Sequence, residues 1–171
     1  FFSSSACVYN TDFQNKANIC GLKEEDAYPA NPEDGYGWEK LFSERMCRHF
    51  YEDYGLETRV ARYHNVYGPF GTYDGGREKS PSAICRKIAL AKKNKDESIE
   101  IWGDGNQTRS YLYIDDCILG TMKLFHSDYR KPLNIGSDEQ VCINELVSKI
   151  ENIAKIKPLK RKYKLNMPLG V

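Results

Sequence analysis

Segments with the pattern of β-strands alternate along this chain with segments that have the pattern of amphipathic helices. Such alternation predicts an α/β fold built on a mainly parallel sheet. The opening residues are expected to form a short buried strand that runs into a polar loop over 10–18. Later strand-like segments are 58–65, 99–102, 110–114 and 133–137, and helix-like segments are 36–54, 80–93, 115–125 and 143–153.

The first helix-like segment has the clearest pattern. Apolar side chains recur at every fourth position, which predicts one apolar helix face, and Gly55 follows as a stop signal. In the third helix, Asp115 or Asp116 is expected to cap the N-terminus. The face of the first helix consists of Phe42, Met46, Phe50 and Tyr54, with Trp38 and Leu41 beside it.

Charge and cysteine spacing exclude several classes of protein. The net charge of +1 does not favour a nucleic-acid partner, and no apolar run is long enough for a transmembrane helix. The chain opens without Met or a signal-peptide pattern, as if in the middle of a strand. None of the six cysteines forms a CxxC pair, so we expect reduced thiols, no metal and a cytoplasmic location. The cysteines are Cys7, Cys20, Cys47, Cys85, Cys117 and Cys142.

A Tyr-x-x-x-Lys motif is formed by Tyr36 and Lys40. Positions four apart share a helix face, so the ammonium can stabilise the tyrosine phenolate as a general base. The motif alone is weak, because an exposed tyrosine near a helix start gives the same pattern. Two further motifs strengthen it: SSSxxVY at 3–9, which ends in a possible catalytic hydroxyl, and RxxNVYGP at 62–69.

These three motifs, in this order, resemble the extended short-chain dehydrogenase/reductases that act on nucleotide sugars, within the NAD-dependent epimerase/dehydratase family. The resemblance implies a catalytic triad of Ser5, Tyr36 and Lys40, with Tyr36 and Lys40 also contacting NAD. It implies a Rossmann-type, doubly wound parallel sheet and a homodimer.

The domain organisation follows from that resemblance. Residues 1–70 are expected to be the C-terminal part of the NAD-binding domain, and 71–171 mainly a substrate-binding region interleaved with the last Rossmann elements. The sequence contains no GxxGxxG phosphate loop, which that family carries upstream of the SSS strand. We therefore expect a partial Rossmann fold with an unpaired sheet edge, unable to hold NAD alone and ending before a nucleotide-binding arginine.

A finer resemblance points to the members of that family that invert C3 and C5 of a GDP-sugar. It rests on SACVY at 5–9, GGREK at 75–79, WGDG at 102–105, QTRS at 107–110 and NIGSDE at 134–139. Oxidation of C4 to a ketone acidifies the protons on C3 and C5, and inversion then needs a base and an acid on opposite faces. The resemblance makes Cys7 the base and Lys79 the acid.

The same resemblance places a larger set of residues around the GDP-sugar. The guanidinium of Arg109 suits a pyrophosphate, because it can fork onto two phosphate oxygens. The set is Ser5, Ala6, Cys7, Asn65, Glu78, Lys79, Ser80, Lys87, Gln107, Thr108 and Arg109.

Other interpretations stay open. A 4-epimerase of the same fold would leave Cys7 and Lys79 without a task, and a 4,6-dehydratase usually has acidic residues after the serine strand. A non-catalytic redox-sensing or RNA-binding scaffold would commonly lack the tyrosine or the lysine. The basic cluster at 155–164 reads as a solvated face, with phosphate binding as the alternative.

Overall fold

The computed structural model describes residues 1–14 and 21–167. Cys20, most of the second half of the predicted 10–18 loop, and the chain end at 168–171 lie outside these ranges. The described chain forms two compact units. The first comprises Phe1–Val66 and Tyr111–Asp138, and the second Tyr67–Ser110 and the described part of Glu139–Gly170. The assignment of 1–70 to a cofactor and 71–171 to a substrate stays a prediction.

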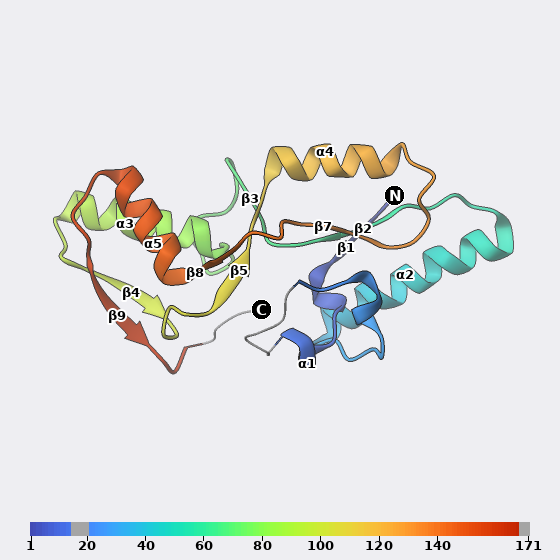
Figure 1. Cartoon of the computed structure of the whole chain (residues 1–171), viewed down its shortest axis with the longest axis horizontal. Helices are drawn as coiled ribbons and strands as arrows, with labels where there is room; N and C mark the ends of the chain where they lie inside the picture. The colour runs from blue at the N-terminus through green and yellow to red at the C-terminus, as the bar shows by residue number, and fades with distance from the viewer. Residues whose placement is uncertain (15–20, 168–171) are drawn as a thin grey trace. The chain divides into compact units, whose positions relative to one another are not determined.

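The first unit is built on a parallel sheet, as predicted. Among the described residues its strand order is β1–β2–β7, in which Ser5 lies opposite Tyr63, and Arg62 opposite Asn134. Helices α2 and α4 lie on opposite sides of this sheet (Figure 1). The bounds are β1 Phe2–Ser5, α2 Gly35–Tyr54, β2 Val60–Tyr63, α4 Ile114–Phe125 and β7 Leu133–Ile135.

Local sequence signals account for the ends of α2. The Asp34 side chain accepts a hydrogen bond from the Gly37 N–H at 3.0 Å, which caps the N-terminus. Gly55 ends the helix in the left-handed conformation, at φ 67°. The predicted bounds of this helix are therefore confirmed.

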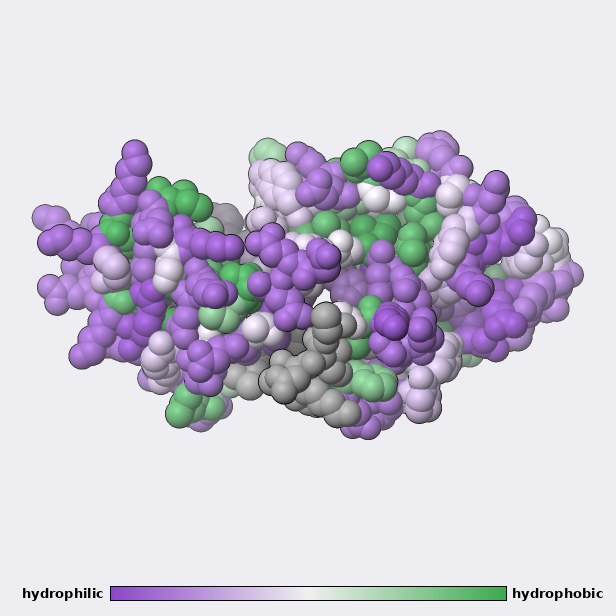
Figure 2. Space-filling view, in the orientation of Figure 1, coloured by the Kyte–Doolittle hydropathy of each residue, from purple (hydrophilic) through white to green (hydrophobic). Residues whose placement is uncertain are grey.

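The predicted apolar face of α2 is not the buried one. Phe42 is 64% exposed and Tyr54 77%, whereas Leu41 and the carboxylate of Glu44 are buried. Helix periodicity finds a stripe, but the neighbouring elements decide which stripe is covered. On α4, the buried residues are Cys117 and Leu124. Hydrophobic residues at the surface beside α4 are visible in Figure 2; those exposed on this helix are Ile118, Leu119, Met122 and Phe125.

The predicted cap of α4 is also wrong. Tyr113 occupies the N-cap position and makes no side-chain capping bond there. Asp115 and Asp116 lie inside the first turn, where their charges still face the positive end of the helix dipole. The segment predicted as one strand at 110–114 is divided by this helix start and by a break after Ser110.

Shorter elements complete the first unit. The buried Val8, Tyr9 and Ala27 pack with Leu41 of α2, and the buried Ala61, Leu112 and Ile135 pack with Cys117 and Leu124 of α4. These elements are η1 Ala6–Val8, α1 Thr11–Gln14, η2 Glu24–Ala27, β3 Val66–Tyr67, of which only Val66 belongs to this unit, and β6 Leu112–Tyr113.

The second unit packs two helices against a parallel strand pair, β4–β9. Its core consists of Ile84, Ile88, Ile99, Ile101, Ile143 and Val147. A second, antiparallel pair, β5–β8, sets Arg109 opposite Val141. The bounds are α3 Ser80–Asn94, β4 Ser98–Trp102, β5 Thr108–Ser110, β8 Gln140–Cys142, α5 Ile143–Ala154 and β9 Lys160–Lys164.

The basic cluster at 155–164 is only partly a solvated face. Its C-terminal half is strand β9, in which the Arg161 guanidinium forms an ion pair with the buried Glu151 carboxylate. Burial alone would raise the pKa of Glu151, but the hydrogen bonds from Arg161 and the Leu159 N–H lower it overall.

The described residues include no helix of the length and apolar character needed to cross a membrane.

Candidate functional site

The Tyr-x-x-x-Lys pair lies on the first two turns of α2. The Lys40 ammonium is 5.5 Å from the centre of the Tyr36 ring and 5.1 Å from that of Phe2 in β1. The Tyr36 side chain is 48% exposed, so its phenol can be reached from outside. The predicted one-turn spacing therefore places a cation beside an accessible phenol.

Ser5 and Cys7 lie where β1 ends. The Ser5 hydroxyl caps the 3-10 turn η1 by accepting a hydrogen bond from the Cys7 N–H at 3.2 Å. Among the described residues no acceptor takes the proton of the Ser5 hydroxyl, so it can donate to a ligand. Cys7 is a half-buried free thiol in the turn that this cap stabilises.

Gly37 brings the start of α2 against that turn. A Cβ at this position would lie 2.2 Å from the Cys7 carbonyl oxygen and 2.8 Å from the Pro32 Cβ. Only glycine permits so close an approach of the two backbones. Gly37 thus sets Tyr36 next to the turn that carries Cys7, a role that the sequence pattern did not reveal.

A buried ion pair fixes α2 to the sheet one turn beyond Lys40. The Arg62 guanidinium contacts both oxygens of the Glu44 carboxylate, at 2.9 and 2.6 Å, and the Ser4 hydroxyl donates to Glu44 at 2.5 Å. Burial lowers the pKa of Arg62, but the bonds and charge of Glu44 outweigh it and raise the pKa overall. Arg62 belongs to the RxxNVYGP motif, whereas no sequence pattern points to Glu44.

The polar network continues to β7. The Tyr9 phenol donates to the Asn134 side-chain oxygen at 2.5 Å and accepts from Arg62 at 3.2 Å. His64 Nε2 lies 3.0 Å from the same Asn134 oxygen. Burial is the largest influence on His64 and lowers its pKa. Asn65, predicted to bind substrate, follows β2 with φ 38°, and its carbonyl accepts from the Leu112 N–H.

The second unit carries the other predicted residues, beginning with the loop before α3. The Glu78 carboxylate accepts from the Gly76 N–H at 2.7 Å and from Arg86 at 3.0 Å. Lys79 is exposed at the N-cap position, and Ser80 is the first helical residue.

Three polar residues predicted to bind substrate either contact strand β4 or belong to strand β5. The Lys87 ammonium donates to the Glu100 carbonyl at 3.0 Å and lies 5.8 Å from the Trp102 ring centre. The Gln107 amide donates to the Trp102 carbonyl at 2.7 Å, while its own oxygen is buried without a partner among the described residues. Arg109 donates to the Thr108 carbonyl at 2.7 Å.

The turn between β4 and β5, which contains Gly103 and Gly105, is held against α5. Gly105 has φ 79°, and a Cβ there would lie 2.4 Å from the Asn144 side-chain oxygen. The Asn144 N–H donates to the Gly105 carbonyl at 2.9 Å. The left-handed backbone therefore favours glycine in this turn, which precedes Gln107.

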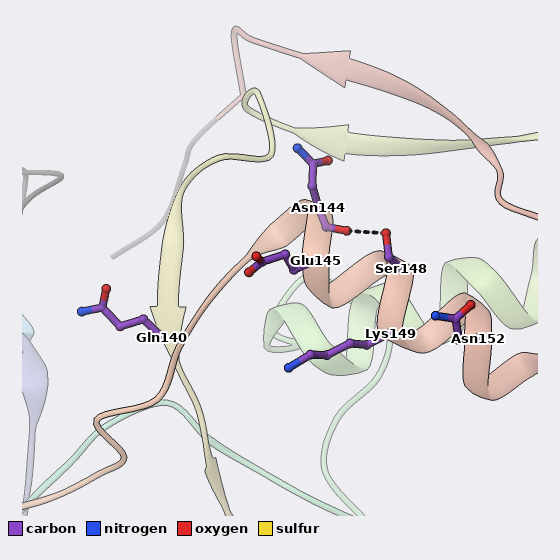
Figure 3. A pocket seen from close by; sticks show the side chains of 6 residues that line it. All are labelled: Gln140, Asn144, Glu145, Ser148, Lys149 and Asn152. Atoms are coloured by element: carbon purple, nitrogen blue, oxygen red, sulfur yellow. Dashed lines mark hydrogen bonds between the residues drawn. The ribbon is translucent and has the colours of Figure 1, made fainter.

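An open groove of about 560 Å³, lined by polar and charged residues, runs along the outer face of α5 (Figure 3). The Ser148 hydroxyl donates to the Asn144 carbonyl at 3.0 Å within it. The groove contains none of the residues predicted to bind substrate or cofactor; its lining is Gln140, Asn144, Glu145, Ser148, Lys149 and Asn152.

The structure thus divides the predicted residues between its two units. Ser5, Ala6, Cys7, Tyr36, Lys40 and Asn65 belong to the first unit, and Glu78, Lys79, Ser80, Lys87, Gln107, Thr108 and Arg109 to the second. Within the first unit the Tyr36–Lys40 pair, the Ser5 hydroxyl and the Cys7 turn all belong to elements that pack together, β1, η1 and α2.

Comparison with known proteins yields a consistent set of similarities. The sequence model of the NAD dependent epimerase/dehydratase family matches residues 1–136. GDP-mannose 3,5-epimerase 1 of Oryza sativa subsp. indica is 52% identical over 146 residues, 85% of this chain and 37% of that protein. GDP-mannose 3,5-epimerase of Arabidopsis thaliana is 49% identical over 150 residues, 88% of this chain and 39% of that protein.

A solved structure shares the architecture. The UDP-N-acetylglucosamine 4-epimerase of Methanobrevibacter ruminantium M1, in complex with UDP-N-acetylmuramic acid, aligns with a TM-score of 0.84 at 26% identity. The alignment covers 99% of this chain and 51% of that one. The chain therefore spans about half of this structure and less than two fifths of the two curated epimerases.

Proposed function

This chain belongs to the NAD dependent epimerase/dehydratase family, and from that premise we propose that it carries the Tyr–Lys centre of a GDP-mannose 3,5-epimerase. The whole protein would convert GDP-mannose to GDP-L-galactose by oxidation at C4, inversion at C3 and C5, and re-reduction at C4. The observation that carries the proposal is the Lys40 ammonium 5.5 Å from the ring of an accessible Tyr36.

Tyr36 has the geometry of the base for the C4 hydroxyl. The neighbouring cation stabilises the phenolate, and the Ser5 hydroxyl can donate to the developing alkoxide oxygen. NAD, when bound, supplies the acceptor for the C4 hydride. An exposed phenol with a lysine one turn away fits the nicotinamide-ribose end of that cofactor, and Tyr36 and Lys40 would hold it there.

Cys7 and Lys79 are proposed as the base and the acid for the inversions. The C4 ketone acidifies the C3 and C5 protons, so a thiolate can remove a proton and an ammonium can return one from the opposite face. Both side chains are reachable in their units: Cys7 is half-buried and Lys79 exposed. The remaining predicted contacts, including Arg109 on the pyrophosphate, complete the GDP-sugar site. The whole protein is proposed to work as a cytoplasmic homodimer.

A 4-epimerase is the second candidate, because a 4-epimerase shares the architecture with a TM-score of 0.84. Such an enzyme needs the Ser5–Tyr36–Lys40 triad but no acid–base pair at C3 and C5. Exchange of carbon-bound hydrogen with solvent therefore separates the two functions.

The test is incubation of the complete protein with NAD and GDP-mannose in deuterated water. We expect deuterium at C3 and C5 of the sugar. In Cys7→Ser this exchange should fall by at least about a hundredfold, because a hydroxyl is a far weaker acid than a thiol and forms little of the anion that acts as base. The transient reduction of NAD should persist, since oxidation at C4 does not use the thiol.

Cys85→Ser is the matched control, because Cys85 is an exposed thiol on α3 with no assigned role. It should exchange at the wild-type rate. Wild-type protein that reduces NAD but incorporates no deuterium would favour the 4-epimerase. Equal exchange in Cys7→Ser and wild type would mean that the base is another group.

A further inference from the structure

In the loop before Lys79, backbone N–H groups donate hydrogen bonds to two carboxylates, those of Asp74 and Glu78. Asp74 accepts a hydrogen bond from the Gly75 N–H at 2.9 Å, and Glu78 accepts one from the Gly76 N–H at 2.7 Å. Gly75 and Gly76 have φ values of 94° and 84°, a region that side chains disfavour. The backbone is thus folded tightly before it reaches Lys79.

Arg86 joins both carboxylates to α3. Its two terminal nitrogens lie 3.4 Å from the Asp74 carboxylate and 3.0 Å from that of Glu78. The Glu78 side chain is 10% exposed and that of Arg86 27%, so water screens this pair less than a surface pair. The Glu78 backbone N–H, that of Gly76 and Arg86 together lower the pKa of Glu78 by hydrogen bonding to its carboxylate.

We propose that Arg86 is the positioning residue for the acid Lys79, on which it acts through Glu78. Lys79 follows Glu78 directly and occupies the N-cap of α3, two turns before Arg86. The contacts of Arg86 with Glu78 and Asp74 hold the loop to the helix, and they therefore fix the backbone position of Lys79. The inference rests on the proposed function, because only there does Lys79 transfer a proton.

The contacts also refine the role of Glu78. Resemblance assigned Glu78 to the substrate, yet each of its carboxylate oxygens already accepts a hydrogen bond from within the chain. Glu78 is thus the link between the guanidinium and the loop, whether or not it also contacts a sugar hydroxyl. Arg86 itself follows from no sequence motif, since one arginine on a helix has no pattern.

The experiment separates the two steps of the reaction in the complete, NAD-containing protein. In Arg86→Met, deuterium exchange at C3 and C5 should fall about 10- to 100-fold, the cost of a small misplacement of a catalytic group. Reduction of NAD by GDP-mannose should stay within about twofold, since the Tyr36–Lys40 pair is untouched. Arg86→Lys keeps the positive charge but lacks the pair of terminal nitrogens that reach Asp74 and Glu78. We therefore expect a partial recovery of deuterium exchange.

Lys149→Met is the control, because it removes one charge from an ion pair on the exposed face of α5 in the same unit. It should change neither step. Glu78→Gln combined with Arg86→Met should be no slower than the slower single variant, as expected for residues that act in series. A double loss equal to the product of the single losses contradicts an action through Glu78.

The remaining outcomes are equally decisive. Wild-type exchange that persists in Arg86→Met and Arg86→Lys overturns the role of Arg86 alone. Loss of exchange and of NAD reduction by the same factor overturns it too, because a general loss of structure affects both steps. Absence of exchange in wild type instead overturns the proposed function.

Discussion

At the scale of single residues, Gly37 decides how closely helix α2 approaches the turn that carries Cys7. Its Cα faces the Cys7 carbonyl, where a Cβ would come to 2.2 Å. At Gly35, two residues earlier in α2, no atom of the described residues outside the adjoining helix backbone lies within 4 Å of the corresponding position. The two glycines therefore form a natural pair for an experiment.

Gly37→Ala should destabilise the fold by about 1–3 kcal/mol, because the backbone atoms it meets cannot move aside like a flexible side chain. It should also lower the rate of NAD reduction, since Tyr36 would shift from Ser5. Gly35→Ala should keep the activity and the stability. Urea unfolding and the reduced-nicotinamide absorbance measure the two effects. Equal behaviour of the two variants would contradict the close approach.

At the scale of elements, α2 is anchored by charge as well as by apolar packing. Glu44 is 4% exposed and Arg62 2%, and their carboxylate and guanidinium pair across the helix–sheet contact. Both charges have left water, so loss of one partner leaves the other uncompensated. The orientation of α2 about its own axis, and with it that of Tyr36 and Lys40, depends on this pair.

Glu44→Gln should lower the free energy of unfolding by about 3 kcal/mol, as for other buried pairs that lose one charge. Glu52→Gln on the same helix should change it little, because Glu52 pairs with Arg48 in solvent. Urea unfolding curves give both changes in the free energy of unfolding. Glu44→Leu with Arg62→Met should recover much of the loss, and failure to do so would mean that shape or the hydrogen bonds to Ser4 and Tyr9, rather than charge, dominate there.

At the scale of the whole molecule, His64 makes the stability depend on pH. Burial is the main reason that its folded pKa lies below the ordinary value of 6.5, with Arg62 acting in the same direction and Asn134 and Glu24 against it. The unfolded chain thus binds the proton more readily than the folded one. The stabilising effect is complete above the unfolded pKa and is lost as the pH falls through the folded pKa.

The free energy of unfolding should therefore decrease as the pH falls below about 6.5, the ordinary histidine value, in wild type, and should decrease less in His64→Gln. Glutamine keeps a nitrogen that can reach Asn134 but does not titrate. His126→Gln, at an exposed position after α4, is the control and should follow wild type. Parallel curves for wild type and His64→Gln would assign the pH dependence to other groups.

Much of the molecule was determined by local sequence. Asp34 and Gly55 end α2 where their chemistry predicts, and the four-residue spacing puts Lys40 beside Tyr36. Parallel pairing followed from the alternation of strands and helices. The helix ends and the Tyr36–Lys40 pair depend on interactions within a few residues, and parallel pairing follows from the order of the elements, so these features can be predicted from the sequence alone.

Only the tertiary structure decided which groups face each other across the chain. Phe42 looks like a core residue by its spacing and is exposed, whereas Glu44 looks like a surface residue and is buried with Arg62. Gly37 and Arg86 gained their roles in the same way, from a carbonyl 30 residues away and from a carboxylate eight residues away. Periodicity ranks the faces of a helix by hydrophobicity, but burial depends on partners that are distant in sequence.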